Sequence, residues 1–182
     1  MKKYFLNKKN IQRILLIGGK YGVAVGTLTV LFRYLLLSNT DRIQGNMLGL
    51  LIAGLILILG QYAAFRVFND KHPKNTLLFL PTLTVGIIFS VCLGGIAGLT
   101  HYIEATYIDP EWSAKALAYA QETWASRNYS QENINGQIEW TANFQNPSLW
   151  ALTTMKFLII VSFGVTLLVA TFMKMIEETT IH

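Results

Sequence analysis

Four long apolar runs dominate this chain of 182 residues and constrain its fold more than any motif does. They cover roughly residues 14–37, 47–68, 77–100 and 149–173, and each has about the 20 residues that a helix needs to cross a bilayer. With 52% hydrophobic and 14% charged residues, the chain has too little polar surface for a water-soluble globule of this size. We therefore predict an all-α integral membrane protein with four transmembrane helices, formed by residues 1–182 as a single membrane domain.

The basic residues divide unequally between the two sides of the predicted spans. Arg and Lys favour the cytoplasmic side, because translocating them across the membrane is costly. One side, which includes both termini, carries Lys2, Lys3, Lys8, Lys9, Arg13, Arg66, Lys71, Lys74 and Lys174. The other side carries only Arg42, Lys115 and Arg127. The imbalance predicts that both termini are cytoplasmic.

The segment 105–148, between the third and fourth spans, is expected outside the cytoplasm. Asp109-Pro110-Glu111 is typical of a helix start, and a second start follows at Ser130, which predicts two short amphipathic helices. All four tryptophans lie in this segment or at its junction with the last span: Trp112, Trp124, Trp140 and Trp150. Because Trp favours the headgroup level, we expect the segment to lie along the outer membrane face. A Trp-lined platform for carbohydrate is the alternative.

Small residues recur at every fourth position in the first three spans. The ladders are Gly18, Gly22 and Gly26; Gly45, Gly49 and Ala53; and Gly86, Ser90, Gly94 and Gly98. Such small-xxx-small stripes let two helix backbones approach closely in a membrane. They could hold an internal four-helix bundle, or one stripe could stay open for a partner protein or a second copy. The fourth span has few small residues, so we expect it to be the most lipid-exposed helix.

Four ionisable residues fall at similar depth near the outer ends of the spans: Arg33, His101, Glu104 and Lys156. Charged groups inside a span are costly unless they pair, line water or extend to the surface. We expect Glu104 to pair with Arg33, with Lys156 or with both, which makes the four a candidate binding cluster. In the alternative, the cations extend to the headgroups and Glu104 is solvated. On the inner side of the second span, Tyr62 and Arg66 lie one helical turn apart with Gln61 beside them, which predicts an interhelical hydrogen bond and an interfacial anchor, or else a polar cavity lining.

No pattern in the chain predicts catalysis or a cofactor. The single cysteine, Cys92, excludes an intramolecular disulfide and a cysteine-based zinc site. His101 and Glu104 have i, i+3 spacing, but no third ligand follows at a recognisable distance, so no metal is expected. The glycine pairs lack the Lys-Ser/Thr of a phosphate-binding loop. The formal net charge of +5 does not indicate nucleic acid, because the basic residues flank spans.

Several short motifs give the chain a family resemblance. They are Lys20-Tyr21-Gly22 at the first span, Arg66 at the end of the second, a Tyr-Ile-Asp-Pro-Glu stretch at 107–111, and a Phe-x-Lys stretch at 172–174. In these features the chain resembles the uncharacterised bacterial four-span membrane family called domain of unknown function 4199. The resemblance implies a multi-pass protein of the bacterial inner membrane and transfers no catalytic residue.

The function expected from these patterns is that of a non-catalytic accessory or scaffold subunit of a bacterial envelope membrane complex. Its partners would be the lipid bilayer and either another membrane protein or a second copy of the chain, met through the small-residue stripes. A small transporter or lipid-handling protein is the first alternative, with Arg33, Glu104 and Lys156 along a polar path. The second alternative is a membrane enzyme on a lipid-linked substrate, with His101 and Glu104 as acid and base.

Overall fold

The computed structural model describes residues 8–36, 47–70, 79–126, 129–142 and 146–180, and nearly all of these residues are helical. Four helices are long: α2 (Lys8–Leu36), α4 (Met47–Asn69), α5 (Phe79–Ile103) and α8 (Pro147–Thr180). Between α5 and α8 lie a π-helical turn, η1 (Glu104–Ile108), and two short helices, α6 (Trp112–Ser126) and α7 (Gln131–Ala142). This confirms the predicted all-α class, with four helices that are long and apolar enough to cross a membrane. Positions 37, 77 and 78 of the predicted spans lie outside the described residues.

The long helices extend beyond the predicted runs where polar residues still favour helix. The α2 helix starts at Lys8, and α8 continues to Thr180, because both ends carry good helix formers and no breaker. The start of α8 is as expected from Asn146-Pro147. The Asn146 Oδ1 accepts a hydrogen bond of 3.0 Å from the Ser148 N–H, and proline occupies the first helical position, where its missing N–H costs nothing.

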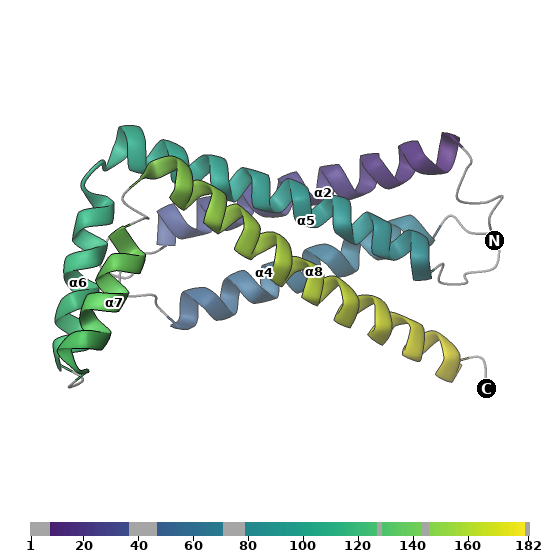
Figure 1. Cartoon of the computed structure of the whole chain (residues 1–182). Helices are drawn as coiled ribbons and strands as arrows, with labels where there is room; N and C mark the ends of the chain where they lie inside the picture. The colour runs from purple at the N-terminus through teal and green to yellow at the C-terminus, as the bar shows by residue number, and fades with distance from the viewer. Residues whose placement is uncertain (1–7, 37–46, 71–78, 127–128, 143–145, 181–182) are drawn as a thin grey trace.

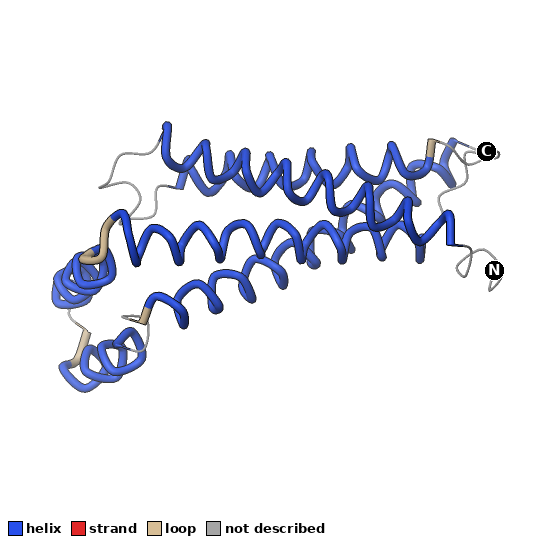
Figure 2. The backbone as a smooth tube through the Cα atoms, turned by 90° about the horizontal axis from the view of Figure 1, so that it is seen from above, coloured by secondary structure: helices blue, strands red, loops and turns tan. Residues whose placement is uncertain are grey.

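The four long helices form one elongated bundle, with α5 packed against both α2 and α8. The α4 helix packs mainly on α2 and makes smaller contacts with α8 and α5. Figures 1 and 2 show that the start of α2 and the end of α8 lie at the same end of the bundle. A shared core of buried side chains joins the helices, with Phe65, Phe68, Val85 and Phe89 at its centre.

The spans differ in how much of their surface the bundle covers. In the most apolar window of each helix, 44% of residues are buried in the third span and 22% in the fourth, which are the extremes of the four. The third span is therefore the central helix. The prediction that the fourth span would be the most exposed is confirmed.

The glycines of α2 lie where this helix approaches the backbone of α5. A Cβ atom added to Gly22 would lie 2.5 Å from the carbonyl oxygen of Phe89, and one added to Gly18 would lie 2.7 Å from that of Val85. At Gly26 the nearest atom would be the Cβ of Ile96, at 3.1 Å. Any side chain at Gly22 or Gly18 would have to move one backbone away from the other.

The glycines of α5 lie on the contact with α8. An added Cβ at Gly94 would lie 2.7 Å from Ile159 Cγ1, one at Gly98 would lie 3.0 Å from the carbonyl oxygen of Ala151, and one at Gly86 would overlap the side chain of Thr166. Gly49 of α4 is also buried, while Gly45 lies outside the described residues. These contacts are internal, which favours the reading in which the stripes of α2 and α5 serve the bundle itself.

The helices α6 and α7 form a hairpin across the end of the bundle opposite the start of α2 and the end of α8 (Figures 1 and 2). They pack against each other, and the turn between them includes a 3.3 Å hydrogen bond from the Tyr129 N–H to the carbonyl oxygen of Trp124. Trp124 and Trp150 are partly buried. The side chains of Trp112 and Trp140 lie outside the description, so the expected position along a membrane face stays a prediction.

Candidate functional site

The candidate site lies where α2 and α5 end, on the same side of the bundle as the hairpin. Arg33 is in the last turn of α2, and His101 is in the last turn of α5. Glu104 begins the π-helical turn that follows, which is closed by a 2.9 Å hydrogen bond from the Asp109 N–H to the Glu104 carbonyl oxygen. Helical structure stops before Pro110, because the residue before a proline favours an extended backbone; Asp109 has φ −141° and ψ 80°.

Arg33, His101 and Glu104 meet in one cluster. The Arg33 Nη1 donates to His101 Nε2 at 2.7 Å, and its Nη2 lies 3.4 Å from Glu104 Oε2. The same carboxylate oxygen lies 3.6 Å from His101 Nδ1. An arginine can only donate, so Nε2 acts as the acceptor and the ring proton is on Nδ1, which faces Glu104. The cluster thus brings a guanidinium, an imidazole and a carboxyl group into mutual contact.

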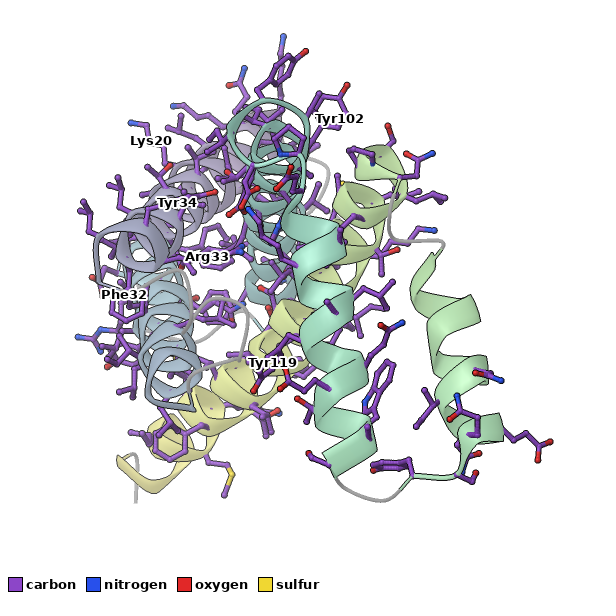
Figure 3. The ribbon with its side chains drawn as sticks, turned by 90° about the vertical axis from the view of Figure 1, so that its left-hand side faces the viewer. Lys20, Phe32, Arg33, Tyr34, Tyr102 and Tyr119 are labelled. Atoms are coloured by element: carbon purple, nitrogen blue, oxygen red, sulfur yellow. The ribbon has the colours of Figure 1, made fainter. Side chains whose placement is uncertain are left out.

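The cluster is largely shielded from its surroundings. The exposed fraction of the side chain is 5% for Glu104, 15% for His101 and 23% for Arg33. The ring of Trp150, at the start of α8, lies 6.4 Å from that of His101, centroid to centroid. Figure 3 shows Arg33 pointing from α2 toward the interior, whereas Lys20, on the same helix, points outward. A buried charge pair holds two elements together mainly because separating the partners would leave a charge without compensation.

The predicted contact between Glu104 and Arg33 is confirmed, and His101 joins it. Lys156 is exposed on α8, and within the described part of the chain it forms no ion pair with Glu104. The cluster therefore has three of the four candidate residues. Its role in binding stays a prediction. In the described residues, no group of three or more His, Cys, Asp or Glu side chains is arranged to hold a metal ion.

A second polar contact, at the opposite end of the bundle, was not anticipated from the sequence. Arg13 of α2 donates from Nη2 to the carbonyl oxygens of Phe68, at 2.6 Å, and Val67, at 3.1 Å. Its guanidinium also lies 5.3 Å from the centroid of the Phe68 ring. These carbonyls belong to the last turn of α4, which has no partners for them within the helix. Arg13 thus caps the C-terminal end of α4, in addition to being one of the basic residues from which the orientation is predicted.

Polar side chains also join the helices inside the bundle. Gln61 of α4 donates from Nε2 to the carbonyl oxygen and the hydroxyl of Ser162 on α8, at 2.8 and 2.9 Å. The Ser90 hydroxyl of α5 lies 2.9 Å from the same hydroxyl, and Asn69 donates to Thr82 Oγ1 at 3.1 Å. The sequence predicted an interhelical hydrogen bond in the group of Tyr62, Arg66 and Gln61, and in the structure Gln61 makes it. The partner could not be named from the sequence, because several hydroxyls lie at similar depth.

The hairpin contains a cavity of about 350 Å³, lined by Trp124, Tyr129, Asn133 and Ile134. At the base of the hairpin, Lys115 Nζ lies 3.0 Å from Asp109 Oδ1 and 3.7 Å from Glu111 Oε2. The hydrogen bond to Asp109, and then the negative charges nearby, raise the pKa of Lys115 above its ordinary value. The cavity joins residues from both hairpin helices and the turn, which sequence reasoning did not single out as a group.

Comparison with known proteins gives a family without an assigned activity. No curated protein and no solved structure matches the chain. A family model does match, over residues 20–175, which include all four long helices in large part. The expected resemblance is confirmed: the chain belongs to the family described as Protein of unknown function (DUF4199).

Proposed function

We propose that this protein is a non-catalytic accessory or scaffold subunit of a membrane complex in the bacterial envelope. The observation that carries the proposal is that polar contacts tie all four long helices to one another. Arg33 joins α2 to α5, Arg13 joins α2 to α4, and Gln61 joins α4 to α8. Ser90 and Ser162 add a contact between α5 and α8. A subunit that positions partners needs a body that keeps one shape.

The alternatives need groups that these contacts already engage. A transporter has to part its helices around a polar path, but Arg33 and Glu104 contact each other, and Lys156 lies apart on an exposed face. A hydrolytic pair made of His101 and Glu104 would need one group to act on a substrate, yet both contact Arg33. These contacts support a structural role for the cluster, in which it fixes the outer ends of α2 and α5.

We infer that small-xxx-small packing operates inside the bundle and that a partner protein docks elsewhere. Close approach at Gly22 and Gly94 is already used by α5 and α8. A leucine at Gly94 would strike Ile159 and the backbone of Met155, so it would disturb the fold rather than report on a partner. Exposed bulky side chains that a partner could cover lie on all four spans, and those of α4 and α8 include Leu59, Ile160 and Leu168.

The orientation belongs to the same proposal. The basic residues near the two chain ends and Arg66 favour a cytoplasmic position for that end of the bundle, in the bacterial inner membrane. The hairpin of α6 and α7 would then lie on the periplasmic side. There it would be accessible to periplasmic segments of a partner.

Site-specific photocrosslinking in native membranes tests the proposal. A photoreactive amino acid is placed at three exposed positions, Leu59 (63% exposed), Ile160 (70%) and Leu168 (72%), and at buried Phe89 as the matched control. We expect a crosslinked protein of defined mass from one exposed face and none from Phe89. Mass spectrometry then identifies the partner. If exposed positions sampled over all four spans yield only lipid adducts, the chain acts alone and the scaffold proposal is wrong.

A further inference from the structure

We propose that the cavity between α6 and α7 is a binding site for an uncharged saccharide ring. The site is independent of the accessory role, because its lining comes from the hairpin and not from the bundle. The lining combines two aromatic side chains, Trp124 and Tyr129, with the carboxamide of Asn133 and the aliphatic side chain of Ile134. The three kinds of group match the two faces and the edge of a sugar ring.

The hairpin holds these groups in place from both sides of its turn. Trp124 is in the last full turn of α6, where its carbonyl oxygen accepts from the Tyr129 N–H. Ser130 caps α7 by accepting from the Asn133 N–H at 3.4 Å and, through its carbonyl oxygen, from the Ile134 N–H at 3.0 Å. The lining residues therefore sit on helix ends whose backbone is already hydrogen-bonded. A site of this kind is formed before its ligand arrives.

The lining selects the class of ligand. A sugar ring has an apolar C–H face, which stacks on indole or phenol, and hydroxyls at its edge, which a carboxamide can bind as both donor and acceptor. The described lining residues are uncharged and therefore do not favour a charged ligand. An acyl chain would gain nothing from Asn133. The volume, about 350 Å³, is near the lower limit of about 300 Å³ for ligand pockets, which suits one or two rings.

The two asparagines of the first turns of α7 differ in the way a site requires. The Asn135 carboxamide is engaged, because its Oδ1 accepts from Gln131 Nε2 at 3.1 Å. The Asn133 carboxamide lines the cavity and forms no hydrogen bond within the described part of the chain. Asn133 is thus available to a ligand, and Asn135 is its matched control on the same helix.

The source of the saccharide follows from the position of the hairpin. The cavity lies at the end of the bundle opposite the start of α2 and the end of α8 (Figure 1). In the orientation proposed above, this end faces the periplasm, where envelope glycans are exposed. The ligand class itself does not depend on that orientation, since it rests on the lining.

Ligand-observed saturation-transfer NMR on the full-length protein in nanodiscs tests the site. Detergents with sugar headgroups are avoided, because they would compete. The probes are maltotriose, cellotriose and triacetylchitotriose, with choline as the cationic probe and methyl phosphate, whose methyl protons the experiment observes, as the anionic probe. We expect at least one trisaccharide to bind with a dissociation constant of about 1 mM, as few contacting atoms allow no more. Choline and methyl phosphate should give no signal.

Variants assign the binding to this cavity. Trp124→Ala should weaken the affinity by about tenfold, while Trp124→Phe, which keeps an aromatic face, should retain most of it. Asn133→Ala should weaken binding, and Asn135→Ala should not. Three results would overturn the proposal. They are the absence of a saturation-transfer signal from all three trisaccharides at a concentration 10-fold above the expected dissociation constant, a signal from choline or methyl phosphate alone, and an equal loss of affinity in the two asparagine variants. Since no partner is present, these outcomes are separate from the fate of the scaffold proposal.

Discussion

The close backbone contact of α2 with α5 predicts a measurable difference in stability between alanine variants at two glycines three residues apart. Gly22 faces α5, where an added Cβ would lie 2.5 Å from the Phe89 carbonyl oxygen, whereas an added Cβ at Gly19 would meet nothing within 4 Å. Carbon atoms pack best at about 3.5–4.0 Å, so Gly22→Ala forces the two backbones apart by about 1 Å. Because the obstacle is backbone, no side-chain rotation relieves it.

The expected magnitude follows from comparing the two variants. Overpacking of this kind costs about 1–3 kcal/mol of unfolding free energy. Alanine also favours helix over glycine by about 1 kcal/mol, and this gain applies equally to Gly19→Ala and Gly22→Ala. The difference between the two variants therefore isolates the contact: Gly22→Ala should be less stable than Gly19→Ala by about 1–3 kcal/mol. The adjacent pair Gly94 and Gly95 should show a difference of the same sign, because an added Cβ at Gly94 would lie 2.9 Å from the Met155 carbonyl oxygen and one at Gly95 would meet nothing within 4 Å.

Reversible unfolding in mixed micelles with an increasing fraction of SDS measures these differences. Circular dichroism follows the loss of helix, and tryptophan fluorescence follows the hairpin and the start of α8. Equal stabilities for Gly19→Ala and Gly22→Ala would refute the reasoning, since α2 and α5 would then not be in close contact. A loss at both glycines would point to a general effect of side chains on α2.

Four further outcomes are expected. Glu104→Gln should cost about 3–5 kcal/mol of stability, and the double variant Arg33→Met with Glu104→Leu should recover much of the loss, as measured by the same unfolding assay. Arg13→Met should destabilise by about 1–3 kcal/mol through the uncapped end of α4, while Lys20→Met, on an exposed position, should change little. Because the pKa of Lys115 is raised, its contribution to the stability of the hairpin base is present below the ordinary pKa of 10.5 and is lost only as pH rises through the raised pKa. A spin label on α6 should therefore become more mobile only in that alkaline range. Green fluorescent protein fused after the last residue should fluoresce, and alkaline phosphatase inserted in the turn between α6 and α7 should be active, unless the orientation is reversed.

The sequence was sufficient for the spans because their length and hydropathy depend on the bilayer and not on tertiary detail. It was also sufficient for the contact between Arg33 and Glu104, because two opposite charges at one depth of a membrane strongly favour meeting. Lys156 shares that depth but faces another direction around its helix. The direction depends on which face of α8 packs against α5, and a single sequence does not define that face.

The remaining features escaped prediction for identifiable reasons. Arg13 binds backbone carbonyls of another helix, and carbonyls have no signature in the sequence. The π-helical turn at 104–108, where Glu104 and Ala105 are buried, has no distinctive composition. The hairpin cavity joins Trp124 to Asn133 across a turn, and a periodicity argument treats these residues as parts of separate helices. In each case the missing information was a contact between elements.

The contacts of α5 with α2 and with α8 differ in which helix supplies the glycines. The order of α2, α5 and α8 in the bundle therefore cannot be reversed. Toward α2, α5 offers its backbone and side chains such as Ile88 and Ile96 to glycines; toward α8, it offers its own glycines to Ile159 and Thr166. At each of these two contacts, one helix supplies the glycines and the other supplies the side chains, so the two helices cannot exchange roles. Two copies of α5 would not fit together in either neighbour's place. If two molecules of this protein exchange helices, each glycine stripe has to pack again on the side chains of its usual neighbour. Otherwise two glycine stripes would face each other with a void between the helices.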